Sequence, residues 1–204
     1  RIGEGDKGLN TGGMGAVSPV KFADNKFMNK VEESVIKRTV NGIKKENLDY
    51  KGFIFAGLMN VNGDPYVIEY NVRMGDPETQ VVIPRIKNDL LQIINKCIEE
   101  KINEIDLDIK ENFTTTVILA ADGYPESYKK GDEINNLEEF ENSKIFHAGT
   151  SKKDDKILSN GGRVLACTGF GKRLDDALKN SYRLANNIAW KNKYFRKDIG
   201  QDLK

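Results

Sequence analysis

The sequence has very little cysteine, histidine and tryptophan. Among its 204 residues there are two cysteines, one histidine and one tryptophan. Two cysteines are too few for a disulfide framework or a thiolate metal site. Cys97 lies in a helical pattern and Cys167 in a strand pattern, and both are interpreted as core residues. Disulfide-stapled scaffolds and thiolate metal domains are therefore excluded.

An excess of one charge and long hydrophobic runs are also absent. The chain carries 32 Lys and Arg against 31 Asp and Glu, a net charge of +1, and the two signs are interspersed. Without a basic stripe to neutralise phosphates, nucleic acid is not expected as a partner. No apolar run approaches the roughly 18 residues that cross a bilayer, and no segment resembles a signal peptide, so a cytoplasmic protein without a membrane partner is expected.

Glycine, by contrast, is concentrated near the start of the chain. The opening RIGEGDKGLNTGGMGAVSPV has six glycines in its first fifteen residues, which predicts a loop. Gly3, Gly5 and Gly8 fit the dinucleotide-binding pattern G-x-G-x-x-G, but that motif requires a preceding strand and a helix that begins within it. Here Gly12 and Gly13 follow instead, so a dinucleotide-binding loop is rejected.

The next segments show the patterns of a helix, a hairpin and two further helices. Asn62-Gly63-Asp64 separates the strand-like runs GFIFAGLMNV and PYVIEYNVR, and Asn-Gly is a strong signal for a tight hairpin turn. Asp76-Pro77-Glu78-Thr79 resembles a helix start, with an Asp cap and Pro at the first helical position. Helices are predicted from Asp24 to about Lys45, from Asp76 onward, and over the apolar positions Leu90 to Ile102.

The remainder of the chain has a different residue pattern, with short strand-like runs between turns. Short runs rich in β formers, TTTVILAA, KIFHAG and GRVLACTGF, alternate with Gly, Asp, Asn and Pro turns and predict a small sheet or half-barrel. The apolar stripe from Leu174 to Ile188 predicts one helix that closes it. A polar stretch from Asn103 to Asn112 indicates a boundary, giving domains 1–110 and 111–204 and an α+β fold class.

The second hairpin run places polar groups at alternate positions. Period-two alternation predicts one face with Val67, Glu69, Asn71 and Arg73, and a core-packing face with Tyr66, Ile68, Tyr70 and Val72. An isolated Glu-x-Asn-x-Arg is most often the solvated face of an ordinary strand. A carboxylate and an amide roughly 7 Å apart along a strand can also both supply oxygen to Mg²⁺. The Arg73 guanidinium can hold phosphoryl oxygens, and the helix start at Asp76 favours an anion. Together with Glu69 and Asn71, these features indicate a site for phosphoryl transfer.

Six motifs occur in an order known from one enzyme family. Over the whole chain, GLNTGGMGAVSP, FAGLMN, VIEYNVRMGDPETQ, FHAGT, NGGRVL and FRKDIG resemble the carboxy-terminal half of glycinamide ribonucleotide synthetases, also called phosphoribosylamine–glycine ligases. The resemblance implies a partial ATP-grasp core, an antiparallel sheet with flanking helices, followed by a small mixed β/α domain. It also implies ATP-dependent ligation of glycine to 5-phosphoribosylamine through glycyl phosphate, a step of purine synthesis, with ATP and Mg²⁺ or Mn²⁺ as cofactors.

The resemblance further implies roles for particular residues. Glu69 and Asn71 would be the metal ligands, and Arg73 would steady the transferring phosphoryl group. The substrate-binding residues would be Asn10, Thr11, Gly12, Gly13 and Met14 of the opening loop, then Asp76, Glu78, Arg196 and Lys197. The substrate-binding residues also have plainer interpretations: a surface turn for the loop, a helix cap and first-turn carboxylate for the acids, and surface charges for the basic pair.

The sequence departs from the family pattern in two places. GFIFAGLMN has no carboxylate, so a second Mg²⁺ would be held by Glu69 and phosphates alone. The family's amino-terminal half, with a lid and a phosphate-clamping lysine, should precede Arg1. That half is therefore the expected partner, and the chain alone is expected to be inactive. Another ATP-grasp ligase of purine synthesis and a non-catalytic homologue remain as alternatives.

Overall fold

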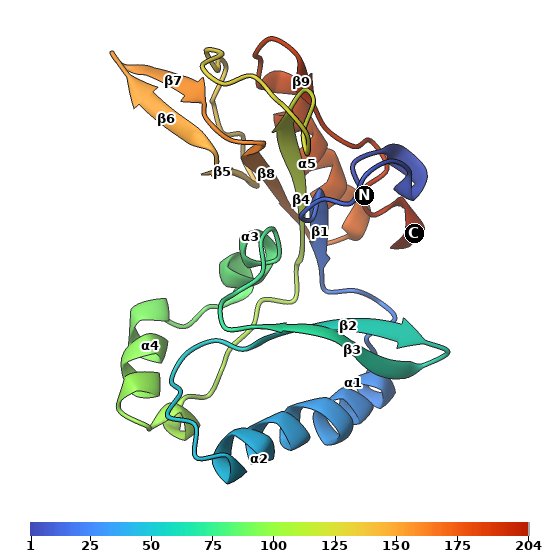
Figure 1. Ribbon diagram of the computed structural model, residues 1–204, viewed down its shortest axis with the longest axis vertical. Helices are drawn as coiled ribbons and strands as arrows, with labels where there is room; N and C mark the ends of the chain where they lie inside the picture. Colours follow the sequence, from blue (N-terminus) through green and yellow to red (C-terminus); the bar gives the residue numbers. More distant parts are fainter. Residues whose placement is uncertain (204) are drawn as a thin grey trace. The chain divides into compact units, whose positions relative to one another are not determined.

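A computed structural model describes residues 1–203, which belong to two compact units (Figure 1). The first unit comprises residues 1–18, 76–85 and 109 onward, and the second comprises residues 19–75 and 86–108. The division of the chain into domains 1–110 and 111–204 stays a prediction. Within the described residues, no helix combines the length and the apolar character needed to cross a membrane.

Helices and antiparallel strands both contribute, which confirms the predicted α+β class. The strands are β1 (Gly15–Ser18), β2 (Phe55–Val61), β3 (Asp64–Asn71), β4 (Phe113–Ala121), β5 (Ser143–His147), β6 (Thr150–Lys153), β7 (Lys156–Ser159), β8 (Arg163–Gly171) and β9 (Lys193–Tyr194). The α-helices are α1 (Asn25–Val31), α2 (Lys37–Lys45), α3 (Thr79–Val82), α4 (Leu90–Ile98) and α5 (Leu174–Asn187). Shorter helical turns are η1 (Glu4–Asp6), η2 (Glu32–Ile36), η3 (Ile83–Arg85), η4 (Ile102–Glu104) and η5 (Gln201–Leu203).

In the second unit, one long helical segment packs against the β2–β3 hairpin. The predicted cap is confirmed, because the Asp24 carboxylate accepts a hydrogen bond from the Phe27 amide at 2.8 Å. The segment continues through α1, the π-helical turn η2 and α2 to Lys45, as predicted. Its buried residues Phe27, Val31 and Val35 pack against Ala56 and Leu58 of β2.

The predicted hairpin is confirmed. Strands β2 and β3 pair antiparallel, and Asn62 and Gly63 at the turn have positive φ angles of 53° and 84°. Asparagine and glycine adopt such angles at low cost, which is why this dipeptide closes the hairpin.

A β-bulge changes which hairpin residues share a face. Gly57 pairs with Glu69, but Leu58 pairs with Val67, so Ile68 is an extra residue on β3. Because cross-strand partners lie on the same face, Val67 lies on the Leu58 face, opposite to Glu69. The predicted grouping of Val67 with Glu69 is therefore wrong, since strict alternation does not hold across a bulge.

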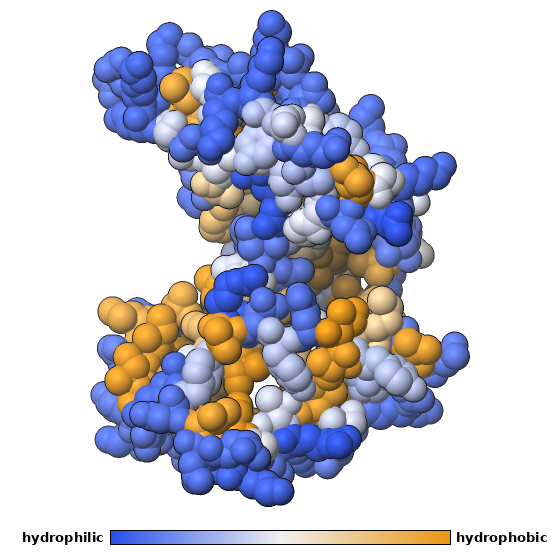
Figure 2. Space-filling view, in the orientation of Figure 1, coloured by the Kyte–Doolittle hydropathy of each residue, from blue (hydrophilic) through white to orange (hydrophobic). Residues whose placement is uncertain are grey.

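The predicted core face of the hairpin is largely exposed. Tyr66, Ile68, Tyr70 and Val72 are 59%, 63%, 50% and 74% exposed, and Figure 2 shows hydrophobic side chains at the surface of this unit. The prediction that this face packs in the core is wrong for the described chain. The helical segment packs against Ala56 and Leu58 of β2, and most of the apolar surface of β3 is left open.

Helix α4 also belongs to the second unit and is shorter than predicted. The Asp89 carboxylate caps it by accepting from the Leu91 and Gln92 amides at 2.8 and 3.1 Å, and it ends at Ile98. Cys97 of this helix is half-buried beside an apolar hollow of about 380 Å³, so its interpretation as a core residue is wrong.

The first unit is built on a sheet in the order β1-β4-β8-β5, with β9 pairing β4. Strand β1 corrects the prediction that the whole opening segment is a loop, because residues 15–18 pair with β4. The predicted closing helix is confirmed as α5, whose Leu184 and Ala185 join Leu165 and Cys167 of β8 in the core. Burial raises the pKa of the Cys167 thiol to about 12, as befits a core residue.

Candidate functional site

Glu69 and Asn71 point to the same face near the end of β3. Asn71 Nδ2 donates a hydrogen bond to Glu69 Oε1 at 3.2 Å, which confirms that the two side chains adjoin. Their partners on β2 are Gly57 and Phe55, so the residue opposite Glu69 has no side chain. The result is a carboxylate and an amide side by side on an accessible strand face.

These two residues fit a divalent cation of the Mg²⁺ type. Mg²⁺ in proteins is held by one or two side-chain oxygens, with waters and substrate phosphates filling the other positions. Glu69 supplies a charged oxygen, and Asn71 supplies its carbonyl oxygen once the amide is rotated about its terminal torsion. In the described part of the chain, no cluster of three or more His, Cys, Asp or Glu side chains could hold a metal. The pair therefore suits an ion that is completed by a ligand's phosphates.

Arg73 lies just beyond the end of β3. Its side chain is exposed, and Nη1 donates to the carbonyl oxygen of Met74 at 3.0 Å. The guanidinium has five donors, so this single hydrogen bond leaves capacity for phosphoryl oxygens. Strand pairing ends at Asn71, so the predicted face assignment of Arg73 stays a prediction.

In the first unit, the glycine-rich loop is held at several points. Its Gly12 amide donates to the Tyr124 hydroxyl at 3.3 Å, and the Met14 carbonyl accepts from the Ile118 amide at 3.0 Å. The Met14 side chain is 4% exposed and packs in the core, so only its main chain can meet a ligand. The Thr11 hydroxyl is buried and has no partner among the described residues. Buried hydroxyls are usually hydrogen-bonded, so Thr11 is a group that a ligand could satisfy.

Asp76 does not cap a helix as predicted. Helix α3 begins at Thr79, and the Asp76 carboxylate instead accepts from Gln80 Nε2 at 2.8 Å and from Arg163 Nη2 at 3.0 Å. Glu78 occupies the cap position without a side-chain cap hydrogen bond. Because α3 has only four residues, its amino terminus does not provide the anion site predicted for a helix start at Asp76.

Sequence reasoning missed Arg163, the residue that joins Asp76 to the loop. Its Nη1 donates to the carbonyl oxygens of Gly13 at 3.1 Å and of Asp76 at 2.7 Å. Arg163 stands in the motif NGGRVL, but nothing local to that motif points to a partner 87 residues away.

Arg196 is buried among carboxylates, whereas Lys197 is exposed. Arg196 Nε and Nη2 donate to the Asp198 carboxylate at 2.8 and 2.7 Å. Arg196 Nη1 donates to the Asp6 carboxylate at 2.8 Å and to the Arg1 carbonyl at 3.1 Å. These hydrogen bonds tie the start of the chain to its end. They also raise the pKa of Arg196, chiefly through the bond to Asp198.

Asp198 gives this cluster a pH-dependent stability. Hydrogen bonding from Arg196 lowers the pKa of Asp198 from its ordinary value of 3.8 to about 2. A carboxyl whose pKa is lower in the folded than in the unfolded chain stabilises the fold. This stabilisation is complete at pH values above the pKa of the unfolded chain and is lost as the pH falls toward the pKa of the folded chain. We therefore expect Asp198→Asn to cost about 1 to 2 kcal/mol at pH 7 and almost nothing near pH 2.

Urea unfolding of the 204-residue chain between pH 2 and pH 7 measures this effect. Asp202→Asn, an exposed carboxylate in η5, is the matched control and should change stability little at any pH. An Asp198→Asn deficit that stays constant over the whole range would contradict the ion-pair explanation.

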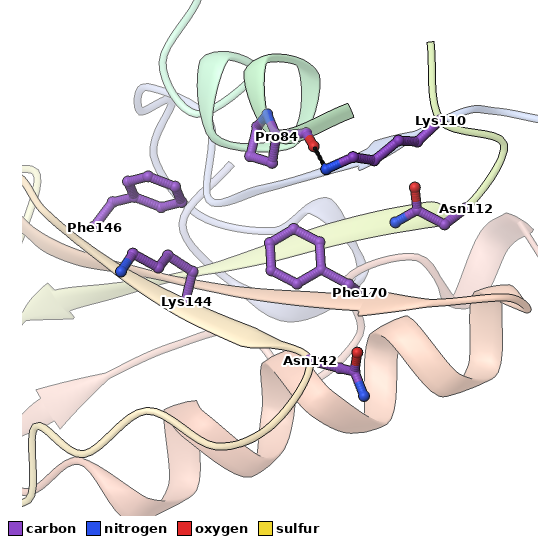
Figure 3. A pocket seen from close by; sticks show the side chains of 7 residues that line it. All are labelled: Pro84, Lys110, Asn112, Asn142, Lys144, Phe146 and Phe170. Carbon is purple, nitrogen blue, oxygen red and sulfur yellow. Dashed lines mark hydrogen bonds between the residues drawn. The ribbon is translucent and has the colours of Figure 1, made fainter. Parts of the chain in front are cut away.

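A separate pocket of about 500 Å³ opens in the first unit, lined by Pro84, Lys110, Asn112, Asn142, Lys144, Phe146 and Phe170 (Figure 3). None of the predicted site residues is among its lining side chains. Lys110 Nζ donates to the Pro84 carbonyl at 3.0 Å, and Lys144 pairs with Glu139 at 3.1 Å. Both ammonium groups thus have partners within the chain.

Two models of one family match successive parts of the chain. Residues 1–79 match the phosphoribosylglycinamide synthetase ATP-grasp (A) domain, and residues 114–202 match the phosphoribosylglycinamide synthetase C domain. The chain belongs to the phosphoribosylglycinamide synthetase family. The resemblance drawn from the six sequence motifs is confirmed.

Relatives and a solved structure agree with this family. A phosphoribosylamine–glycine ligase from Synechocystis is 45% identical over 204 residues, covering 98% of this chain and 49% of the relative. A bifunctional purine biosynthetic protein from Pichia angusta is 45% identical, covering 98% of this chain and 26% of that protein. The crystal structure of a Thermotoga maritima phosphoribosylamine–glycine ligase is 38% identical, with a TM-score of 0.86, covering 97% of this chain and 49% of that one. The chain thus spans about half the length of the single-function ligases that it matches.

Proposed function

We propose that the chain is part of an ATP-dependent phosphoribosylamine–glycine ligase. ATP would phosphorylate the glycine carboxylate, and the amine of 5-phosphoribosylamine would then displace phosphate from the acyl phosphate, giving glycinamide ribonucleotide, ADP and phosphate. The observation that carries this proposal is the 45% identity to a named ligase over nearly the whole chain, together with the two family domains in order. The rest of the ligase is the proposed partner, and a cytoplasmic location is part of the proposal.

In this proposal, Glu69 and Asn71 hold Mg²⁺ or Mn²⁺ at the nucleotide phosphates. The adjacency of the two side chains supports the assignment, since neither side chain is committed to the core. The metal would neutralise charge on the transferring phosphoryl group. Arg73, three residues before Asp76, would contribute a second positive charge through its exposed guanidinium.

The substrate residues are assigned to the loop and to the carboxylates that follow β3. Main-chain groups of residues 10–14 and the unpartnered Thr11 hydroxyl would meet substrate oxygens, while Asp76 and Glu78 would orient the amino groups. For the ribose phosphate, the exposed Lys197 supplies an available ammonium group. Arg196 would contribute only by exchanging one of its carboxylate partners, Asp6 or Asp198, for phosphate.

The reverse reaction of the full-length enzyme tests the proposal and avoids the unstable amine. We expect ATP formation from glycinamide ribonucleotide, ADP and phosphate that requires Mg²⁺, and no ATP formation by the 204-residue chain alone. In the forward direction, ATP use should depend on glycine. Turnover that ignores glycine but responds to another carboxylate substrate would assign a different ATP-grasp ligase, and bound nucleotide without turnover would indicate a non-catalytic homologue.

A further inference from the structure

Arg163, the first residue of β8, connects two segments that the proposed function assigns to the substrate. Through Nη1 it donates to the main-chain carbonyls of Gly13 and Asp76, at 3.1 and 2.7 Å. Through Nη2 it forms an ion pair with the Asp76 carboxylate at 3.0 Å. All three residues belong to the same compact unit. One guanidinium therefore fixes the loop and the Asp76 turn to the same strand.

The loop backbone also lies directly on the guanidinium. A Cβ added at Gly12 would stand 2.7 Å from Arg163 Cζ and 2.8 Å from its Nη2. A Cβ added at Gly13 would stand 2.4 Å from Cδ of Pro77, which is itself fully buried. Close approach favours glycine at both positions, because a side chain at Gly12 would displace the Arg163 guanidinium and one at Gly13 would press on the buried Pro77 ring.

The contacts suit arginine and no other side chain. A planar fork can donate to two carbonyls and one carboxylate at once, whereas a lysine ammonium is a single point from which these directions cannot all be met. Asp76 is held at its other oxygen by Gln80, so its carboxylate is fixed from both sides. The Arg163 side chain is 21% exposed and that of Asp76 is 47% exposed, so the ion pair lies at the surface of the unit with the guanidinium as its more buried half.

We propose that Arg163 is a positioning residue that sets the distance between the main chain of Gly12–Gly13 and the Asp76 carboxylate. It acts through these groups and does not itself touch substrate. This inference rests on the proposed function in taking the loop and Asp76 as substrate-binding groups. Small displacements of such groups weaken catalysis strongly, by up to about a hundredfold.

The test uses Arg163→Met and Arg163→Lys in the full-length enzyme. We expect the KM for glycinamide ribonucleotide in the reverse reaction to rise about 10- to 100-fold in both variants, and the KM for ADP to change less than about threefold. Hydrogen exchange of the loop amides at residues 9–14 should accelerate at least about tenfold in Arg163→Met, while exchange in α5 should not change. Arg173→Met, which removes an exposed arginine at the start of α5, should alter neither readout.

A further variant, at Gly12, moves the guanidinium without removing it. Gly12→Ala should displace the Arg163 fork and reproduce the same selective rise in KM. In the double variant Gly12→Ala with Arg163→Met, the KM for glycinamide ribonucleotide should be no higher than in the more affected single variant, because both changes break the same contact.

The outcomes separate this inference from the proposed function. Unchanged loop exchange in Arg163→Met, equal rises in both KM values, or additive effects in the double variant would each overturn the positioning role. A wild-type enzyme without glycine-dependent turnover would overturn the proposed function, while the exchange measurement would still decide whether Arg163 holds the loop.

Discussion

Glu69→Gln in the full-length enzyme is expected to lower Mg²⁺-dependent ATP formation by about a thousandfold, which corresponds to about 4 kcal/mol of transition-state stabilisation. Glutamine keeps the shape of the side chain but removes the negative charge that a hard divalent cation requires. The fold should hardly change, because Glu69 is exposed on β3 and its hydrogen bond from Asn71 can be kept by the amide oxygen. The measurement is the rate of ATP formation over a range of Mg²⁺ concentrations, together with thermal unfolding.

Asp64→Asn on the same strand is the matched control for this prediction. Asp64 is an exposed carboxylate that pairs with Lys30, so its loss should cost at most about 1 kcal/mol and leave activity intact. If Glu69→Gln lowered the melting temperature in proportion to activity, Glu69 would be a structural residue. Full activity in Glu69→Gln would remove it from the metal site.

Gly169→Ala is expected to destabilise the first unit by about 3 kcal/mol. Gly169 lies two residues before the end of β8, paired with Thr115 of β4 and Ser143 of β5. A Cβ there would stand 2.3 Å from both the Ala177 carbonyl oxygen and the Ser181 amide nitrogen of α5. These are backbone atoms of a packed helix, so relief requires moving α5 away from the sheet. Thermal unfolding should show a drop of about 6 to 12 °C in the transition of this unit.

Gly42→Ala provides the opposite expectation for the same chemical change. Gly42 lies within α2, and a Cβ there would meet nothing within 4 Å. Alanine should therefore stabilise its unit by about 0.5 to 1 kcal/mol through helix propensity. A Gly169→Ala protein as stable as the parent would show that α5 does not sit as close to β8 as described.

The predictions that succeeded depend on residues close together in the sequence. The Asn62-Gly63 turn, the Asp24 cap and the apolar stripe of α5 are governed by local dihedral preferences, capping and helical periodicity. The family was also recognisable, because six short motifs stand in a fixed order along the chain. That Glu69 and Asn71 share a face follows from period-two alternation, which holds here because both residues lie on the same side of the bulge.

The predictions that failed required knowledge of distant partners. The bulge at Ile68 is set by the pairing register with β2, so alternation within β3 could not show that Val67 changes face. Asp76 looked like a helix cap because its neighbours fit that role, yet its carboxylate is bound by an arginine 87 residues later. Likewise, Arg196 looked like a free basic residue but is bound to Asp6, 190 residues earlier.

The sequence by itself determined the α+β class, the hairpin, the main helices, the family and the identity of the candidate metal ligands, because these depend on local geometry and on motif order. Only the tertiary structure decided which faces are buried, which carboxylates are already paired, and that Arg163 holds the glycine-rich loop against Asp76. The physical reason is that hydrogen bonds and ion pairs depend on distances of about 3 Å between atoms, and for residues far apart in the chain those distances are set by the packing of the sheet and helices.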